Sequence, residues 1–520
     1  MEKKIKIGWG KRSIAKEGPV PITGQFHLRI SRGVYKYSSV EINALVIENG
    51  SDAVIFASAD MVAVSPEVLL KAEEILKVES PELPAGKLIV NATHTHAGPA
   101  STRINRDYPP AIDCTDSDEM IEYLGRQLAD AVKDAWQSRA YGSVAYGYGF
   151  ATTGHSRRTV YLEDIGNRDP GSAGLMVNGR AKMYGITNDE LFDGFEAGTD
   201  ATINLLYTFD ENEKITGAVI NVPCPSQTNE HAWVLHGSFW HNVREKLSDK
   251  YGKNFGVIGQ AAAAGDLSPR QLLYLAAEKR RLLLKYPDLV ARYKQNPMLR
   301  ANGEKPDVEH PSFMNELIEM LRAEDIANRI TAAFDEVLSW AGKEKFSAPE
   351  LQHEVRELQL SRRFFDEKLV EIEKQNYAEC IARGFDTTSD TLTALHHNSR
   401  LKSQINRCLG VIKRAEVQQK EPKITTVLHA VKIGNVAFAS NRFELFMDYM
   451  HRIQARSPFE QTFIVQLVVD KYGNGSYLAT ERGTANKGYS ATPYCNQVSA
   501  SGGQELVNAT LETLNQMKEG

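Results

Sequence analysis

Short apolar runs alternate with amphipathic helical patterns in the first half of the chain, and this alternation constrains the fold most strongly. Buried strands are predicted by runs of suitable length and β-branched content at 54–57, 87–92 and 255–258. Helices are predicted by apolar residues of helical period at 68–78, 120–138 and 239–251. Two more strand patterns are joined by a polar turn and lie at 204–208 and 215–222. Alternating elements of this kind predict an α/β fold with a large mixed sheet.

A long stretch of different character separates the two ends of the chain. From about 270 to 420 the residues are nearly all helical in pattern and rich in Leu, Glu, Lys and Arg. After it, strand patterns return at 427–431, 436–439 and 463–469, and a last helix is predicted at 503–517. Because strands lie on both sides of it, we interpret 270–420 as a helix-rich insertion or subdomain within a single domain of 1–520.

The charge and hydropathy of the chain exclude several classes of partner. Lys and Arg number 61 against 66 Asp and Glu, a net charge of −5, so no nucleic-acid partner is expected. No run of 18 apolar residues occurs, so no membrane-spanning segment is expected. The N-terminus leads directly into a strand pattern without a leader. The expected location is therefore the cytoplasm, or outside the cell if a leader has been removed.

The cysteines do not form a recognisable framework. There are five, an odd number, and they are irregularly spaced without a CxxC pair. A disulfide scaffold or a four-cysteine zinc site is therefore not expected. By default each is a small buried apolar residue, and only Cys224 calls for a separate argument.

Two histidines follow the predicted strand at 87–92, in the segment NATHTHAGP. Side chains alternate along an extended chain, so His94 and His96 project to the same face. The end of a buried strand is where open α/β sheets place their ligand crevices. Two imidazoles there are able to share a metal, or one binds a metal while the other handles a proton. The alternative is a pair of histidines with ordinary hydrogen bonds in a loop.

Three further segments carry polar residues of chemical interest. AAAAGDLSP at 261–269 combines small residues, which permit close approach, with Asp266 and Ser268, which otherwise serve as helix caps. Glu444 lies at a strand-to-helix junction, where it is either a functional carboxylate or a charge that complements the helix dipole. NGSYLATE at 474–481 and GYSA at 488–491 form a Gly- and Tyr-rich loop that either lines a site or makes ordinary surface turns.

The order THTHAGP, GDLSP, FE and GSYLATE resembles the neutral (non-lysosomal) ceramidase family, whose pattern is THTHSGP, GDVSPN, GEFT and a tyrosine before a T-x-E segment. The resemblance spans roughly residues 7–517, with the helical stretch poorly matched. It implies the N-terminal catalytic domain of that family, an α/β fold, and a zinc ion held by two histidines, a glutamate and a tyrosine.

The resemblance also implies roles for individual residues. His94, Glu444 and Tyr477 match zinc ligands, and His96 matches the catalytic or substrate-orienting histidine. Ser268 matches a serine proposed to attack or polarise the amide, and Tyr489, twelve residues after Tyr477, matches a tyrosine that holds the scissile carbonyl. Arg157 falls near the substrate-binding arginine, although the same alignment selects Arg158 equally well. Asp266 is expected beside the substrate.

The chain departs from the family pattern at Cys224, which stands where the second zinc histidine belongs. A thiolate is a good zinc ligand, and a Cys-His-Glu-Tyr sphere would be more negative, which makes the zinc a weaker Lewis acid. Alternatively His231 or His236 reaches the metal, or Cys224 is merely buried and the metal site is weak. The family's C-terminal immunoglobulin-like domain also finds no counterpart in the β pattern.

The function that follows is a zinc-dependent amidohydrolase acting on an N-acyl compound, a small molecule or a lipid amide. One alternative is a hydrolase with Cys224 as nucleophile and His94 or His96 as base. The other is a non-catalytic ligand-binding protein on the same scaffold.

Overall fold

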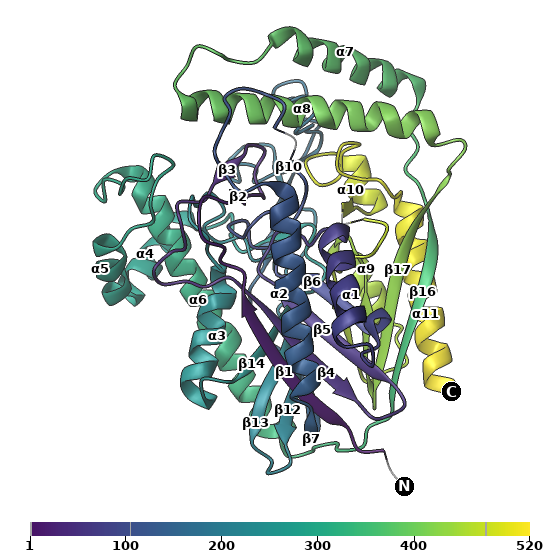
Figure 1. Cartoon of the computed structure of the whole chain (residues 1–520). Coiled ribbons are helices and arrows are strands. Elements are labelled where there is room, and N and C mark those ends of the chain that lie inside the picture. The colour runs from purple at the N-terminus through teal and green to yellow at the C-terminus, as the bar shows by residue number, and fades with distance from the viewer. Residues whose placement is uncertain (1–2, 105, 474–475) are drawn as a thin grey trace.

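A computed structural model describes residues 3–104, 106–473 and 476–520. Asn474 and Gly475, which open the Gly- and Tyr-rich loop, lie outside the described residues. Figure 1 shows the chain with its elements labelled.

A large mixed sheet has the strand order β14-β13-β12-β7-β1-β4-β5-β6. Its strands are β1 (Lys6–Ser13), β4 (Glu41–Glu48), β5 (Ala53–Ala59), β6 (Leu88–Ala92), β7 (Ala140–Phe150), β12 (Thr202–Asp210), β13 (Ile215–Val222) and β14 (Gly256–Ala261). Strands β1 and β7 pair only through Lys6 with Tyr141 and Ile7 with Ala140. The two halves of the sheet are therefore joined at one short stretch. The strands predicted in this half of the chain are confirmed.

A second sheet packs face to face against the first. It has the order β16-β17-β18-β20, with strands β16 (Leu351–Ser361), β17 (Lys423–Ile433), β18 (Val436–Ser440) and β20 (Gln461–Val465). Between the sheets the Phe56 ring lies 4.9 Å from that of Phe438, which lies 4.2 Å from that of Phe463. Strand alternation turns Ile55 and Ala57 to the other face of the first sheet.

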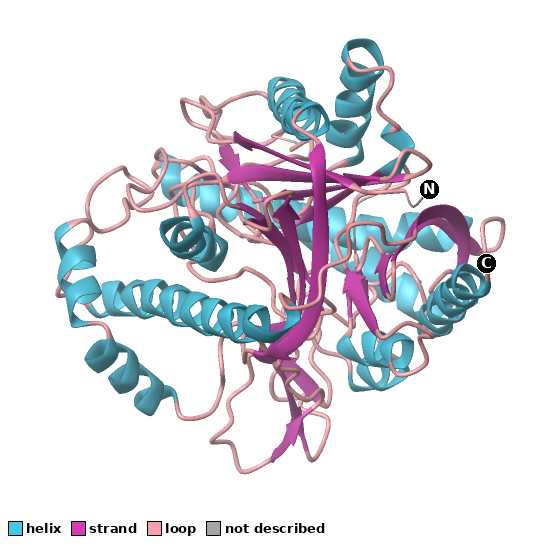
Figure 2. Ribbon diagram, turned by 90° about the horizontal axis from the view of Figure 1, so that it is seen from below, coloured by secondary structure: helices cyan, strands magenta, loops and turns pink. Residues whose placement is uncertain are grey.

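Helices cover the outer faces of both sheets, so that the layers run helix, sheet, sheet, helix (Figure 2). On the first sheet lie α1 (Pro66–Glu79), α2 (Ser117–Gln137), α3 (Ser238–Tyr251) and α6 (Pro311–Ala341). On the second lie α9 (Met447–Gln454) and α11 (Ala500–Glu519). Helix α1 begins two residues before the predicted 68–78, with Ser65 accepting a hydrogen bond from the Val68 N–H and Pro66 in the first turn.

The helix-rich stretch 270–420 contains one long strand that the sequence pattern did not predict. Helices α4 (Leu275–Lys285), α5 (Pro287–Gln295), α6, α7 (Glu367–Arg383) and α8 (Thr391–Val417) are present, but β16 pairs with β17 along its whole length. Charged side chains at Glu354, Arg356 and Glu357 make this strand resemble the helices around it. The prediction of helical structure is wrong at β16, and the helices form two groups, with α7 and α8 together at one end of the molecule (Figure 1).

No helix within the described residues is both long and apolar enough to cross a membrane.

Candidate functional site

Segments that follow strands of both sheets meet at one place. Backbone hydrogen bonds join them: Ser226 N to Thr93 O at 3.2 Å, Ala262 N to Val222 O at 2.8 Å, and Gly265 N to Leu445 O at 2.8 Å. These contacts connect the loops after β6, β13, β14 and β18. Loops at strand ends, held by a rigid scaffold, are a common setting for ligand sites.

His94 is held in an unusual backbone conformation that aims its ring at Glu444. Its φ of 67° is left-handed, which costs free energy in a non-glycine residue and is typical of functional sites. Its Nδ1 lies 2.7 Å from the Val62 carbonyl oxygen, so Nδ1 carries the proton and Nε2 presents a lone pair. That Nε2 is 3.3 Å from Glu444 Oε2 and 3.3 Å from His96 Nε2.

Arg157 and Tyr477 surround the Glu444 carboxylate. Arg157 Nη2 donates to the Tyr477 hydroxyl at 3.0 Å and lies 3.9 Å from Glu444 Oε2. The Tyr477 hydroxyl in turn hydrogen-bonds Glu444. Burial raises the pKa of Glu444, but His94, Arg157 and the Tyr477 hydrogen bond outweigh it, and the pKa lies below its usual value. Glu444 is therefore a buried carboxylate that stays ionised.

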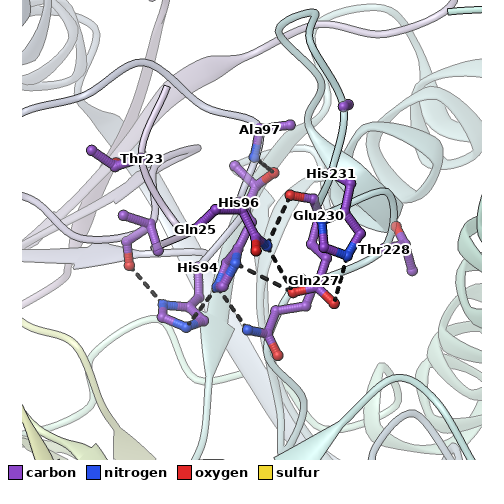
Figure 3. Close-up of polar contacts among 12 residues, drawn as sticks. Thr23, Gln25, His94, His96, Ala97, Gln227, Thr228, Glu230 and His231 are labelled. Atoms are coloured by element: carbon purple, nitrogen blue, oxygen red, sulfur yellow. Dashed lines mark hydrogen bonds and ion pairs between the residues drawn. The ribbon is translucent and has the colours of Figure 1, made fainter. Parts of the chain in front are cut away.

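His96 contacts two residues that no sequence pattern pointed to (Figure 3). Gln227 Nε2 lies 2.7 Å from His96 Nε2, while Gln227 Oε1 accepts from Arg157 Nη1 at 3.4 Å. On the other side of the ring, His96 Nδ1 faces Glu230 Oε2 at 3.6 Å. Burial, with His94 and Arg29 nearby, lowers the pKa of His96 well below its usual value. The imidazole is therefore neutral, with a lone pair on Nε2 and its proton on Nδ1.

The donor atoms around His94 fit a metal ion. Two atoms that carry lone pairs, His94 Nε2 and Glu444 Oε2, lie 3.3 Å apart, an arrangement that a cation or a proton between them stabilises. The Tyr477 oxygen adds a donor of another type. Across the residues that the structure describes, no group of three or more His, Cys, Asp or Glu side chains is spaced to hold a metal. The fit therefore rests on His94, Glu444 and Tyr477 together.

Cys224 does not join this group. Its Sγ lies 3.1 Å from the Thr153 carbonyl oxygen, and the side chain, 0% exposed, packs in the apolar layer between the first sheet and α3 and α6. Burial raises the pKa of its thiol. The chain turns immediately after β13, which directs Cys224 into the core instead of toward His94. The structure thus does not support Cys224 as a metal ligand.

The alternative histidines are also occupied elsewhere. His236 Nδ1 accepts from Ser238 N at 2.8 Å, and its ring stacks on Tyr35. His231 is exposed and lies 3.9 Å from Glu230 Oε1. No described contact links either of them to His94.

Ser268 is buried beside the site and has its own partners. Its Oγ accepts from Arg270 N at 3.0 Å and hydrogen-bonds the Tyr184 hydroxyl. Tyr184 is a third residue that sequence reasoning missed, since it is a lone tyrosine after a short strand. His155 is the backbone pairing partner of Ser268 in a short antiparallel pair, but no hydrogen bond from a histidine side chain to Ser268 Oγ is present in the part of the chain that the structure describes.

Asp266 holds two segments beside the site through hydrogen bonds. Its Oδ1 accepts from Met447 N at 3.1 Å, which satisfies a free N–H at the start of α9, and its backbone oxygen accepts from Arg157 N at 3.1 Å. Asp266 is 2% exposed and is held by contacts within the protein, so its expected place beside the substrate stays a prediction. Burial raises the pKa of its carboxyl from 3.8 to about 6.

Replacing Asp266 by Asn is expected to stabilise the protein at neutral pH and not in acid. The folded state holds the extra proton between pH 3.8 and about 6, so stability falls as pH rises through that window. Above it the charged carboxyl costs about 2–3 kcal/mol, which Asn removes while Met447 N keeps its acceptor. Urea unfolding of both proteins across this pH range measures the difference. An equal difference at both ends of the range contradicts the assignment.

Gly265 explains the run of small residues before Asp266. A Cβ at Gly265 would meet the Glu444 carbonyl oxygen at 2.3 Å, well inside contact distance. The close approach that the Ala-rich run suggested is therefore observed, and it brings the loop after β14 against the residue that faces His94.

Gly265→Ala is expected to destabilise the protein by about 1–3 kcal/mol, because backbone must move to admit the methyl group. The matched control is Gly410→Ala in α8, where an added Cβ meets nothing within 4 Å. That change should stabilise by about 1 kcal/mol through helix propensity. Thermal unfolding of the two variants gives both values, and equal melting temperatures would refute the steric argument.

The two adjacent arginines have separate tasks. Arg157 faces Gln227, Tyr477 and Glu444, as described above. Arg158 is an ion-pair partner of Glu196, with Nε 2.5 Å from Oε2, and donates to the carbonyl oxygens of Lys487 and Tyr489 at 2.6 and 2.7 Å. Arg158 therefore holds the loop that carries Tyr489 in place through hydrogen bonds and does not line the site. The Tyr489 ring lies 5.5 Å from the Tyr477 ring.

Comparison with known proteins identifies the fold. No protein-family model and no curated protein sequence matches this chain. Among solved structures, the neutral ceramidase from Pseudomonas aeruginosa matches with a TM-score of 0.62 and 14% identity, over 100% of this chain and 75% of that one. A ceramidase complexed with C2 matches with a TM-score of 0.62 and 13% identity, over 99% and 75%. The chain has the α/β fold of these ceramidase structures, which confirms the resemblance at the level of fold.

Proposed function

We propose that this protein is a divergent relative of the neutral ceramidases that hydrolyses the amide bond of an N-acyl compound with a bound zinc ion. The observation that carries the proposal is the convergence of His94, Glu444 and Tyr477 on one side of a neutral His96. The shared ceramidase fold supports it.

His94, Glu444 and Tyr477 would hold the metal. A zinc ion in that place supplies positive charge that polarises the scissile carbonyl. The protein's own contribution is to keep His94 in the tautomer that presents Nε2 and to keep Glu444 ionised. The second metal histidine expected at the position of Cys224 is not part of the proposal.

His96 would move the proton. Its Nε2 carries the lone pair that would accept a proton from an attacking water once that water replaces the Gln227 amide there, and Glu230 opposite Nδ1 would stabilise the imidazolium that results. The Gln227 N–H at 2.7 Å marks the direction from which a proton donor reaches Nε2. The same proton then passes to the departing amine.

Arg157, with Tyr477 and Tyr489 packed beside it, would stabilise the negative charge that develops on the amide oxygen. Ser268, already bonded to Arg270 N–H and Tyr184 and without a hydrogen bond to a histidine side chain, would act as a hydrogen-bonding residue. We therefore favour water as the nucleophile.

The test combines metal analysis of the purified protein with hydrolysis of a panel of N-acyl amines. Hydrolysis is measured by the release of the free amine. Stoichiometric zinc and turnover that a chelator abolishes are expected. The absence of both zinc and turnover would overturn the proposal. Thermal stabilisation by the amides without turnover would favour a non-catalytic binding protein.

Cys224→Ala is expected to leave turnover within about 3-fold and zinc content unchanged, because the thiol is buried away from His94 and its pKa is raised. Iodoacetamide should not label Cys224 in the native protein and should label it after unfolding in urea. Loss of turnover together with native-state labelling would instead support a cysteine nucleophile.

A further inference from the structure

A cavity of about 670 Å³ lies next to His96. Its walls come from α4, from the segment before α6, from α6 itself, and from residues 229–232 and Arg270. Glu230 lines the cavity and also lies against His96. Its Oε2 is 3.6 Å from His96 Nδ1, and its Oε1 is 3.0 Å from Arg270 Nη2. Arg270 N also donates to Ser268 Oγ, so the cavity shares a wall with the candidate site.

The cavity wall is a connected series of ion pairs. From Glu230 the series continues through Arg270, whose Nε is 2.7 Å from Glu319 Oε1, to Arg322, whose Nη1 is 2.5 Å from the same oxygen. Arg322 Nη2 then donates to Glu278 Oε2 at 2.9 Å. Because these charged side chains are held by ion pairs, they are not free to rotate out of the cavity and make room for an apolar ligand.

A second ion pair, Arg300 Nη1 to Glu316 Oε2 at 2.9 Å, lies on the same wall. Three buried oxygens of the wall have no hydrogen-bond partner among the residues that the structure describes: Asn229 Oδ1, Glu316 Oε1 and Glu319 Oε2. Asn229 is only 5% exposed and is held at a left-handed φ of 57°. Unpartnered buried acceptors of this kind indicate a ligand, or water, that supplies hydrogen-bond donors.

The charges of the lining balance. Carboxylates and basic groups are equally represented, by Glu230, Glu278, Glu316, Glu319 and by Arg270, Lys279, Arg300, Arg322. A ligand of net charge is therefore not favoured over a neutral one. Hydroxyl groups both donate and accept, so a neutral polyhydroxylated group matches this mixture of donors and acceptors best. The cavity is also lined by the apolar side chains of Leu275, Met298 and Ile318, but a long hydrocarbon chain that filled it would still strip water from the charged groups without replacing its hydrogen bonds.

We propose that this cavity binds the amine-side portion of the substrate, and that this portion is a polyhydroxylated amine of the amino-sugar class instead of a long-chain sphingoid base. The proposal rests on the amidohydrolase function proposed above and specifies its substrate.

The experiment compares four amides that combine two amines with two acyl groups: N-acetyl and N-octanoyl glucosamine, and N-acetyl and N-octanoyl sphingosine, the latter in detergent. At each acyl length, kcat/KM is expected to be about 10²-fold or more higher for the glucosamine amide. Equal or faster hydrolysis of the sphingosine amides would overturn the proposal. If only the octanoyl glucosamine is hydrolysed, the sugar is recognised as part of a lipid; if both glucosamine amides are, the free sugar suffices.

The double variant Arg300→Met/Glu316→Met tests the cavity without touching residues of the candidate site. It should raise KM for the glucosamine amides about 10-fold, leave kcat within about 3-fold, and leave the sphingosine amides unaffected. The matched control is Lys294→Met/Glu309→Met, which removes an ion pair of 2.7 Å from the same region but outside the cavity lining. An equal effect of both double variants would contradict a binding role.

Absence of turnover with all four amides would refute the proposed function, and the cavity is then tested by binding alone. Calorimetric titration with N-acetylglucosamine should show binding that Arg300→Met/Glu316→Met weakens and Lys294→Met/Glu309→Met does not. No binding, or equal binding to all three proteins, overturns the assignment of the cavity.

Discussion

Replacing His94 by Ala is expected to remove the bound zinc and to lower kcat/KM by about 10³-fold or more. His94 is the residue at which the other donors meet: its Nε2 lies 3.3 Å from both Glu444 Oε2 and His96 Nε2. Carbonyl polarisation by a metal is worth several kcal/mol, which corresponds to this loss of rate. Metal content of the purified variant and steady-state kinetics are the measurements.

The comparison that gives this result meaning is Cys224→Ala, which should retain both zinc and turnover. Thermal unfolding of the His94 variant shows whether the fold survives. A His94 variant that folds, keeps stoichiometric zinc and loses only activity would place the metal elsewhere. A variant that loses zinc while keeping its activity would refute a catalytic metal altogether.

Replacing His96 by Ala is expected to lower kcat by about 10²–10⁴-fold while zinc remains bound. His96 is neutral, presents Nε2 toward Gln227 and faces Glu230 through Nδ1, as a general base requires. The two variants should differ although only one residue separates the two positions. His94→Ala should lose the zinc, whereas His96→Ala should keep the zinc and lose kcat. Kinetics and metal analysis of both variants measure that contrast.

Glu230→Gln serves as the intermediate case for His96. It preserves the shape of the side chain but removes the charge opposite Nδ1, so kcat should fall by less than in His96→Ala. Loss of zinc in His96→Ala would show that His96 is itself a ligand. A His96 variant with unchanged kcat would exclude it as the base.

The parts of the site that short motifs specify were predictable from the chain. His94 and His96 follow a buried strand, Glu444 follows another, and the Ala-rich run permits the contact at Gly265. Each of these is a local consequence of strand alternation or of side-chain size. The α/β class was predictable for the same reason.

The parts that depend on packing were not. Cys224 occupies the expected place in the order of motifs, but a turn after β13 directs it into the core, and no local signal reports such a turn. Gln227 and Glu230 follow three and six residues later in a segment without periodicity. Strand β16 was missed because its charged residues, such as Glu354 and Arg356, match the surrounding helices, whereas its pairing with β17 is a contact distant in sequence.

The site brings together segments from widely separated parts of the chain, from the loop containing Gln25 to the loop containing Tyr489. During synthesis, therefore, the candidate site cannot assemble until the chain has emerged from the ribosome at least as far as Tyr489. A product truncated before Glu444 lacks part of the candidate site. The same arrangement makes the chain suitable for a two-fragment complementation reporter, with the break placed between α7 and α8, where each fragment alone lacks part of the site.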